Sequence, residues 1–214
     1  MSAMSRDPVT PDDLRKAAAI AREALSQVAD DAWDVMPPRM TWTRKATIIH
    51  TIGAMHFYST GLASGSREPP ATFRPDPARI DTVDLPALVT SGAAILARVA
   101  EASPHGTRGF HPAGSPDPEG YLAMGCVEIL MHAWDTVNGT PGSIEAADDM
   151  SERIVRRLFP WSATGASGWQ ALLFETGRGE LEGRESPGDM WMWHNAPLEE
   201  WDGKVRRSDR WKGR

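Results

Sequence analysis

The amino-acid sequence predicts an all-α protein built on a four-helix bundle. Four long segments carry apolar residues at helical spacing, and N-cap residues or helix-stop residues mark their ends. Long segments rich in proline and glycine separate several of these helices, which is typical of bundles with long crossover connections. The chain after about residue 165 differs in character, because it combines one short helix with alternating aromatic residues.

The first predicted helix follows Thr10, an N-cap candidate before a proline and two acidic residues, and is expected to continue to about Trp33. A proline pair then ends it. The second helix is expected from about Trp42 to Ala63. Residues 65–84 contain many prolines, which exclude a helix or a central strand and predict a long crossing connection.

Two further long helices and two short ones complete the prediction. An Asn-Gly pair provides the stop signal of the fourth long helix, and a serine is the expected cap of the helix that follows it. These helices are expected at Leu85–Ala102, Pro118–Asn138, from the cap Ser143 to Phe159, and over residues 168–177. Beyond them, the alternation of tryptophans with Met192 and His194 resembles a short edge strand.

We expect two units, a helical bundle over residues 1–165 and a C-terminal elaboration over residues 166–214 that covers one end of it. With 214 residues, the chain is long enough for one good core. A basic tail begins at residue 204. A solvated terminus is its simplest interpretation, and contact with nucleic acid or with an acidic neighbouring subunit is the alternative.

Composition narrows the class of protein. The formal net charge of −6 argues against nucleic acid as the main partner. We expect no membrane span, because no apolar stretch is expected to approach the ~18 residues required, and the N-terminus lacks a signal-peptide pattern. We therefore expect a cytoplasmic location, and the one cysteine, Cys126, fits a reducing compartment because it cannot form an internal disulfide. The sequence leaves open whether the protein forms a homodimer.

Three polar side chains in apolar helical segments form a candidate metal site: His50, Glu128 and His132. The four-residue spacing places Glu128 and His132 on one helical face. Two imidazoles and a carboxylate suit a borderline divalent cation, and three protein ligands leave one coordination position free for chemistry. Zinc is the default ion, and nickel, iron or manganese also fit. The alternative is a hydrogen-bonded Glu-His pair beside a structural core histidine.

Two short motifs surround these candidate ligands. The motif residues are Trp42, Thr43 and His50 in the second helix, and Glu128, His132, Trp134 and Asp135 in the fourth. They resemble the DinB-like metalloprotein superfamily, and within it the mycothiol-dependent maleylpyruvate isomerase branch. The resemblance covers roughly residues 10–140, and it implies a DinB-like four-helix bundle with a metal held by His50, Glu128 and His132.

The resemblance also implies a metal-dependent enzyme of transferase or isomerase type that uses a low-molecular-weight thiol, mycothiol, as cosubstrate. A metal-bound thiol ionises at neutral pH, and its thiolate can attack an electrophilic carbon. The isomerase carries a further C-terminal domain that completes its active site, and this chain looks too short to contain it. We therefore do not carry over the isomerase reaction. The alternative is a noncatalytic metal-binding or small-ligand-binding module of the same fold.

The remaining polar and aromatic candidates have weaker support. Asp135 could orient a ligand imidazole, or form a surface ion pair. Trp42 and Trp134 could wall a pocket, or anchor the core. Arg178 could anchor an anionic substrate, or cap a structural element. The residues expected to be structural, buried or solvated are Cys126, His56, His105, His111 and His194.

Overall fold

A computed structural model describes residues 6–71, 75–162 and 165–208 of the chain. Those residues form six α-helices and no strand, which confirms the all-α prediction. In chain order the helices are α1 (Pro11–Leu25), α2 (Arg44–Ser64), α3 (Leu85–Ala102), α4 (Pro118–Val137), α5 (Asp148–Leu158) and α6 (Gly168–Glu175).

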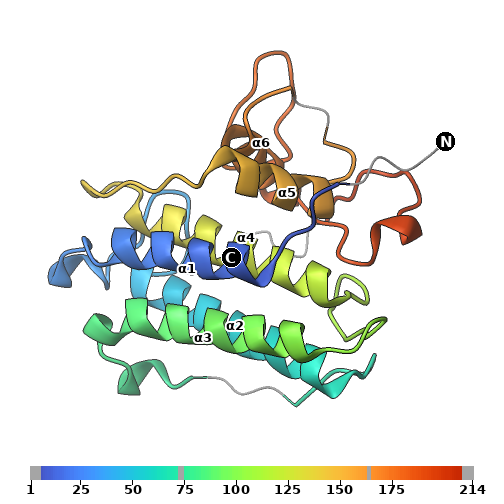
Figure 1. Cartoon of the computed structure of the whole chain (residues 1–214). Coiled ribbons are helices and arrows are strands. Elements are labelled where there is room, and N and C mark those ends of the chain that lie inside the picture. The colour runs from blue at the N-terminus through green and yellow to red at the C-terminus, as the bar shows by residue number, and fades with distance from the viewer. Residues whose placement is uncertain (1–5, 72–74, 163–164, 209–214) are drawn as a thin grey trace.

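The four long helices lie side by side and enclose the main core (Figure 1). Both α1 and α2 contact α3 and α4, whereas α1 and α2 are not direct neighbours. Residues 26–43, which connect α1 to α2, are therefore the crossing connection, because they join two helices that do not pack on each other. The proline-rich connection at 65–84 was expected to cross, but it joins the neighbouring helices α2 and α3.

Helix α3 corrects the expectation that no segment is apolar enough to span a membrane. The segment Thr82–Ala102 has the length and mean hydropathy, 1.4, that a span requires. In the structure, however, Leu85 and Leu96 are fully buried in the core that α3 shares with α1 and α2. A side chain at Gly92 would begin 3.0 Å from Cβ of Met55, so this glycine allows α3 to approach α2 closely.

Local signals account for some helix ends and not for others. Thr10 caps α1 as predicted, because its side chain accepts a hydrogen bond from the Asp13 backbone and Asp13 bonds back to Thr10. Helix α1 ends at Leu25, well before the expected Trp33; Ser26 bonds to the Arg22 carbonyl there. The expected cap Ser143 is also wrong, since α5 begins only at Asp148.

Helices α5 and α6 pack on each other, and α5 also packs on α4, so the two short helices cover one side of the four long helices (Figure 1). The expected edge strand is reduced to one isolated bridge between Trp191 and Arg207. The backbone N–H of Ser208 donates to Met190. The basic tail therefore folds back on the protein as far as Ser208, and its remaining basic residues lie outside the described ranges.

Candidate metal centre

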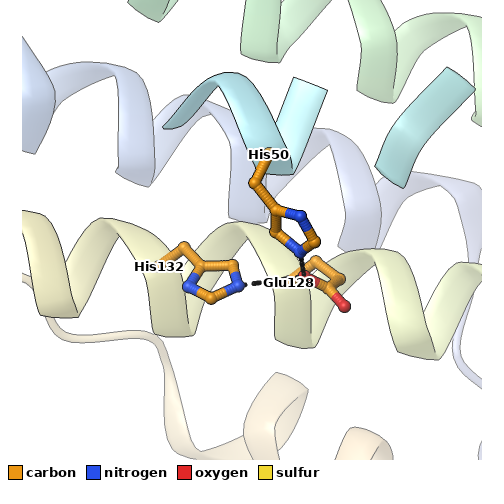
Figure 2. Close-up of side chains that lie close together, drawn as sticks. All are labelled: His50, Glu128 and His132. Carbon is orange, nitrogen blue, oxygen red and sulfur yellow. Dashed lines mark ion pairs between the residues drawn. The ribbon is translucent and has the colours of Figure 1, made fainter. Parts of the chain in front are cut away.

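The three predicted ligands come together between two neighbouring helices (Figure 2). The Thr43 side chain caps α2 by accepting a hydrogen bond from the Ala46 backbone, which starts the helix that carries His50. Helix α4 carries Glu128 and His132 one turn apart. Because α2 packs directly on α4, His50 faces this pair across the helix interface.

The distances fit one shared cation. Oε2 of Glu128 lies 3.1 Å from Nε2 of His132 and 3.5 Å from Nε2 of His50. Ligand atoms that surround a tetrahedral zinc ion at 2.0–2.2 Å lie about 3.4 Å apart. Oε2 is also buried and accepts no hydrogen bond from the described part of the chain. A buried carboxylate oxygen needs a partner, and a cation between the three side chains would supply it.

Burial and neighbouring charged groups shift the pKa values of Glu128 and His132 in opposite directions. Burial raises the pKa of Glu128, but the neighbouring imidazoles of His132 and His50 hold it well below its ordinary value. Burial lowers the pKa of His132, whereas its contacts with Asp135 and Glu128 raise that pKa to about 9. Glu128 is thus an anion at neutral pH, and the imidazole beside it lies in a site that attracts positive charge.

A second carboxylate, that of Asp135, contacts the His132 ring on the side away from Glu128. Oδ2 of Asp135 lies 3.4 Å from Nδ1 of His132, on the ring edge opposite the candidate metal position. Arg178 contacts the same carboxylate twice, with Nε at 3.0 Å from Oδ1 and Nη2 at 2.6 Å from Oδ2. Burial raises the pKa of Asp135, but Arg178 and His132 lower it to about 2. Asp135 is therefore placed to orient His132, as the spacing suggested.

Tyr58 belongs to the site and was missed by the sequence analysis. Its hydroxyl donates to Oε1 of Glu128 at 3.1 Å, and its side chain is 2% exposed. Burial, together with Glu128, raises the pKa of Tyr58 well above its ordinary value, so it remains a donor. The signal for this residue was its position eight residues after His50, which puts both on one face of α2.

The candidate ligands line a cavity of about 990 Å³. The Trp42 ring lies 5.1 Å from the His50 ring, so Trp42 walls this cavity as predicted. The rest of the cavity wall is formed by side chains from α2, from α4 and from the connections between helices. The lining includes, besides the three ligands, the aromatic residues Trp42, Phe57, Tyr58, His111, Trp191 and Trp193, and the charged residues Arg39, Asp135, Arg178 and Asp189.

The structure places the other two predicted substrate contacts, Trp134 and Arg178, differently. Trp134 does not line the cavity, because two residues beyond His132 turn it about 200° around the helix, and it packs against the core instead. Arg178 does line the cavity, but its charge is balanced by Asp135, and Nη1 donates to the Thr176 carbonyl. These contacts support a role for Arg178 in holding Asp135, and contact with an anionic substrate stays a prediction.

The other candidates mostly match the expectation that they are structural. Cys126 is fully buried, and burial raises the pKa of its thiol. His105 is exposed, and His56 does not line the cavity. His194 is buried, with Nε2 3.1 Å from the Pro197 carbonyl. His111 is different, because it is buried and forms part of the cavity wall.

Fold and site together define an all-α protein with a candidate three-ligand metal centre in the wall of a large cavity. No family model matches the sequence, and no curated protein matches it. Two solved structures do resemble the chain. One is a mycothiol-dependent maleylpyruvate isomerase, with a TM-score of 0.56, 15% identity, and coverage of 79% of this chain and 88% of that chain.

The other similar structure is a variant of a mycothiol-dependent maleylpyruvate isomerase in which a histidine is replaced by alanine. It has a TM-score of 0.55, 14% identity, and the same coverage of 79% and 88%. At such identities the likeness establishes the fold. The likeness spans 88% of the isomerase chain, so most of the length of that chain has a counterpart in this fold.

Proposed function

We propose that the protein is a metal-dependent enzyme of transferase or isomerase type that uses a low-molecular-weight thiol, mycothiol, as cosubstrate. The observation that carries this proposal is that His50, Glu128 and His132 aim three donor atoms at one point in the wall of a cavity of about 990 Å³. The names of both similar solved structures support mycothiol as the thiol. The likeness also supports a DinB-like fold.

Zinc is the ion we propose for the three ligands. A divalent cation held there would lower the pKa of a coordinated thiol, so that thiolate forms at neutral pH. The residues of the chain prepare this site. Asp135 orients the His132 ring, and Tyr58 occupies Oε1 of Glu128, which leaves Oε2 directed at the shared position.

The cavity favours catalysis over a structural metal. A structural site is usually closed by four protein ligands, whereas the residues described here supply three on the edge of a cavity. The volume lies at the upper end of the range for small-molecule sites, about 300–1,000 Å³, which leaves room for a thiol and a second small molecule. We further propose a cytoplasmic location, where a thiol cosubstrate stays reduced.

Metal analysis combined with a thiol-consumption assay tests the proposal. The purified protein should contain about one divalent cation, and it should consume mycothiol in the presence of a suitable electrophile from a panel. His132→Ala and His50→Ala should lose most of the metal and the activity. His105→Ala, at an exposed histidine, is the matched control. A protein that holds metal but consumes no thiol with any electrophile would favour the noncatalytic module.

A further inference from the structure

Arg39 lies in the wall of the same cavity, on the connection between α1 and α2, and its side chain is exposed there. A residue that is exposed and also lines the cavity lies at its opening. The backbone of Arg39 is unusual, because among the described residues it is the one residue other than glycine with a positive φ, +68°. A side chain strains this conformation, so the position by itself favours glycine.

A tight turn accounts for this φ. The backbone N–H of Met40 donates to the Pro37 carbonyl at 3.2 Å, so residues 37–40 form a β-turn. Pro38 holds a negative φ at the second position of the turn, and the positive φ at the third position then defines a type II turn. The third position of such a turn prefers glycine, and Arg39 occupies it. The sequence thus has an arginine where the turn alone favours glycine.

The connection that carries Arg39 is held in place by Arg44, which is 4% exposed. Arg44 donates from Nη1 to the Val35 carbonyl at 3.3 Å and from Nη2 to the Asn138 carbonyl at 3.0 Å. Its backbone N–H also donates to the Val35 carbonyl at 3.1 Å. The two ends of the segment 35–44 are therefore joined to each other and to the chain just after α4, so the turn at Arg39 has a fixed position.

The side chain of Arg39 reaches from this turn to the segment after α6. Its Nη2 donates to the Gly177 carbonyl at 2.8 Å, and Gly177 also lines the cavity. In the described part of the chain this is the one hydrogen bond of the guanidinium, and no carboxylate forms an ion pair with it. Arg178, the other arginine of the wall, is paired with Asp135 at 2.6 Å. The arginine charge that a ligand can neutralise is therefore that of Arg39.

Aromatic side chains supply flat apolar surfaces close to this charge. Trp42 lies three residues after Arg39 on the same connection, and its ring lies 5.1 Å from the ring of the candidate ligand His50. Trp191 and Trp193, whose rings lie 5.3 Å apart, form another part of the wall. Aromatic rings pack well on such surfaces. Trp42 thus connects the candidate metal centre with the segment that carries Arg39.

We propose that Arg39 binds the anionic group of the electrophile, and that the electrophile is an aromatic acid whose ring lies against Trp42. This inference rests on the proposed function of the same cavity. A guanidinium has five N–H donors, of which the Gly177 carbonyl takes one, so the others can hold a carboxylate. With its acid group at Arg39, the ring extends along Trp42 toward His50. Arg39 therefore selects acids over neutral molecules of the same shape.

The first test measures binding and requires no turnover. 3-Nitrobenzoate and 3-nitrobenzamide differ in charge but hardly in shape. Isothermal titration calorimetry on the metal-loaded protein should show about 10-fold tighter binding of the acid, the effect of one charge-assisted contact at an exposed position. Arg39→Gln should lose this preference and bind the amide as wild type does. Arg22→Gln, at an exposed arginine of α1 outside the cavity, should keep the preference.

Other results would overturn the proposal. Equal binding of the acid and the amide by the wild type is one of them. A preference for the acid that survives Arg39→Gln and disappears when the metal is removed is another, because it would place the anion on the metal.

Arg39→Gly separates binding from folding. Glycine suits the third position of a type II turn, so this variant should lose the preference for the acid without a lower melting temperature. A lower melting temperature with the preference retained would make Arg39 a structural residue and refute the assignment. Trp42→Leu should weaken binding of the acid and of the amide alike, because it removes the aromatic surface and keeps the charge.

The second test measures the thiol reaction with 4-chloro-3-nitrobenzoate. The thiolate sulfur forms a C–S bond to the ring carbon that carries chlorine, the C–Cl bond breaks, and chloride leaves with the bonding electrons, while the thiol proton passes to solvent. Arg39→Gln should raise KM for this acid about 10-fold with little change in kcat, and should leave KM for 4-chloro-3-nitrobenzamide unchanged. An equal loss for both substrates would contradict the proposal. If the wild-type protein turns over neither substrate, the proposed function fails, and the binding comparison still decides this inference.

Discussion

Replacing Asp135 with asparagine tests how the candidate metal centre is oriented. The Asp135 carboxylate lies 3.4 Å from Nδ1 of His132 and contacts Arg178 at 3.0 and 2.6 Å. Asparagine has nearly the same size but no charge, so Asp135→Asn should preserve the shape of the site and weaken both interactions. Loss of the carboxylate behind a metal-binding imidazole lowers metal affinity about 10- to 100-fold.

The same substitution leaves the Arg178 guanidinium without its anion. Removing one partner of a buried ion pair lowers the free energy of unfolding by about 3–5 kcal/mol. The Arg178 side chain is 11% exposed and keeps its bond to the Thr176 carbonyl, so we expect a loss near the lower end, about 3 kcal/mol. Adding Arg178→Gln removes the unpaired charge. The double variant should therefore regain much of the stability while its metal affinity remains low.

Two measurements separate these effects: competition for zinc against a chelator of known affinity, and urea unfolding monitored by helix content. Asp189→Asn is the control, because Asp189 is an exposed carboxylate in the same cavity wall. If Asp135→Asn bound zinc as tightly as the wild type, Asp135 would have no role in orienting His132. Recovery of zinc affinity in the double variant would show that Asp135 acts only by neutralising Arg178.

Three other substitutions give shorter tests. Tyr58→Phe removes the donor to Oε1 of Glu128 and should weaken zinc binding severalfold in the chelator assay, with little change in helix content. Asp13→Ala should cost about 1–2 kcal/mol in urea unfolding at pH 7, because Asp13 caps α1 and pairs with Arg153 at 2.6 Å. Burial raises the pKa of Asp13, but Arg153 and the N-cap residue bring it below its ordinary value. This stability is therefore present at neutral pH and disappears as the pH falls through the lowered pKa, so the difference between Asp13→Ala and wild type should shrink below about pH 4. Cys126→Ala should keep metal and thiol consumption, since the Cys126 thiol is fully buried; lost turnover in a folded Cys126→Ala protein would contradict the proposed use of an added thiol.

Local sequence signals were sufficient for much of the fold. The cap at Thr10 and the stop after Val137 depend on residues within one helical turn, so they could be predicted without knowledge of the tertiary structure. The end of α1 and the start of α5 could not, because the connections that follow or precede them are shaped by packing. The likeness of Glu128 and His132 to a ligand pair likewise follows from spacing along one helix.

Contacts between distant segments limited the prediction of the site. Tyr58 meets Glu128 over 70 residues of sequence, and His111 meets Asn195 over 84. No periodicity within one helix encodes such pairs. The sequence places His111 in a loop rich in glycine and proline, where most histidines are solvated. Only the folded chain shows that Gly114 gives Asn195 room to reach it.

The arrangement of charge also bears on which ligand would complete the site. Arg178 and Asp135 neutralise each other through their paired contacts, so the carboxylate of Glu128 is the one anion left to the ligand set. With two neutral imidazoles, a divalent cation would leave the centre with one net positive charge. Because the centre is partly buried, that charge would favour an anionic fourth ligand over a neutral one. A thiolate is one anion that carries this charge, so the charge balance agrees with the thiol cosubstrate proposed above.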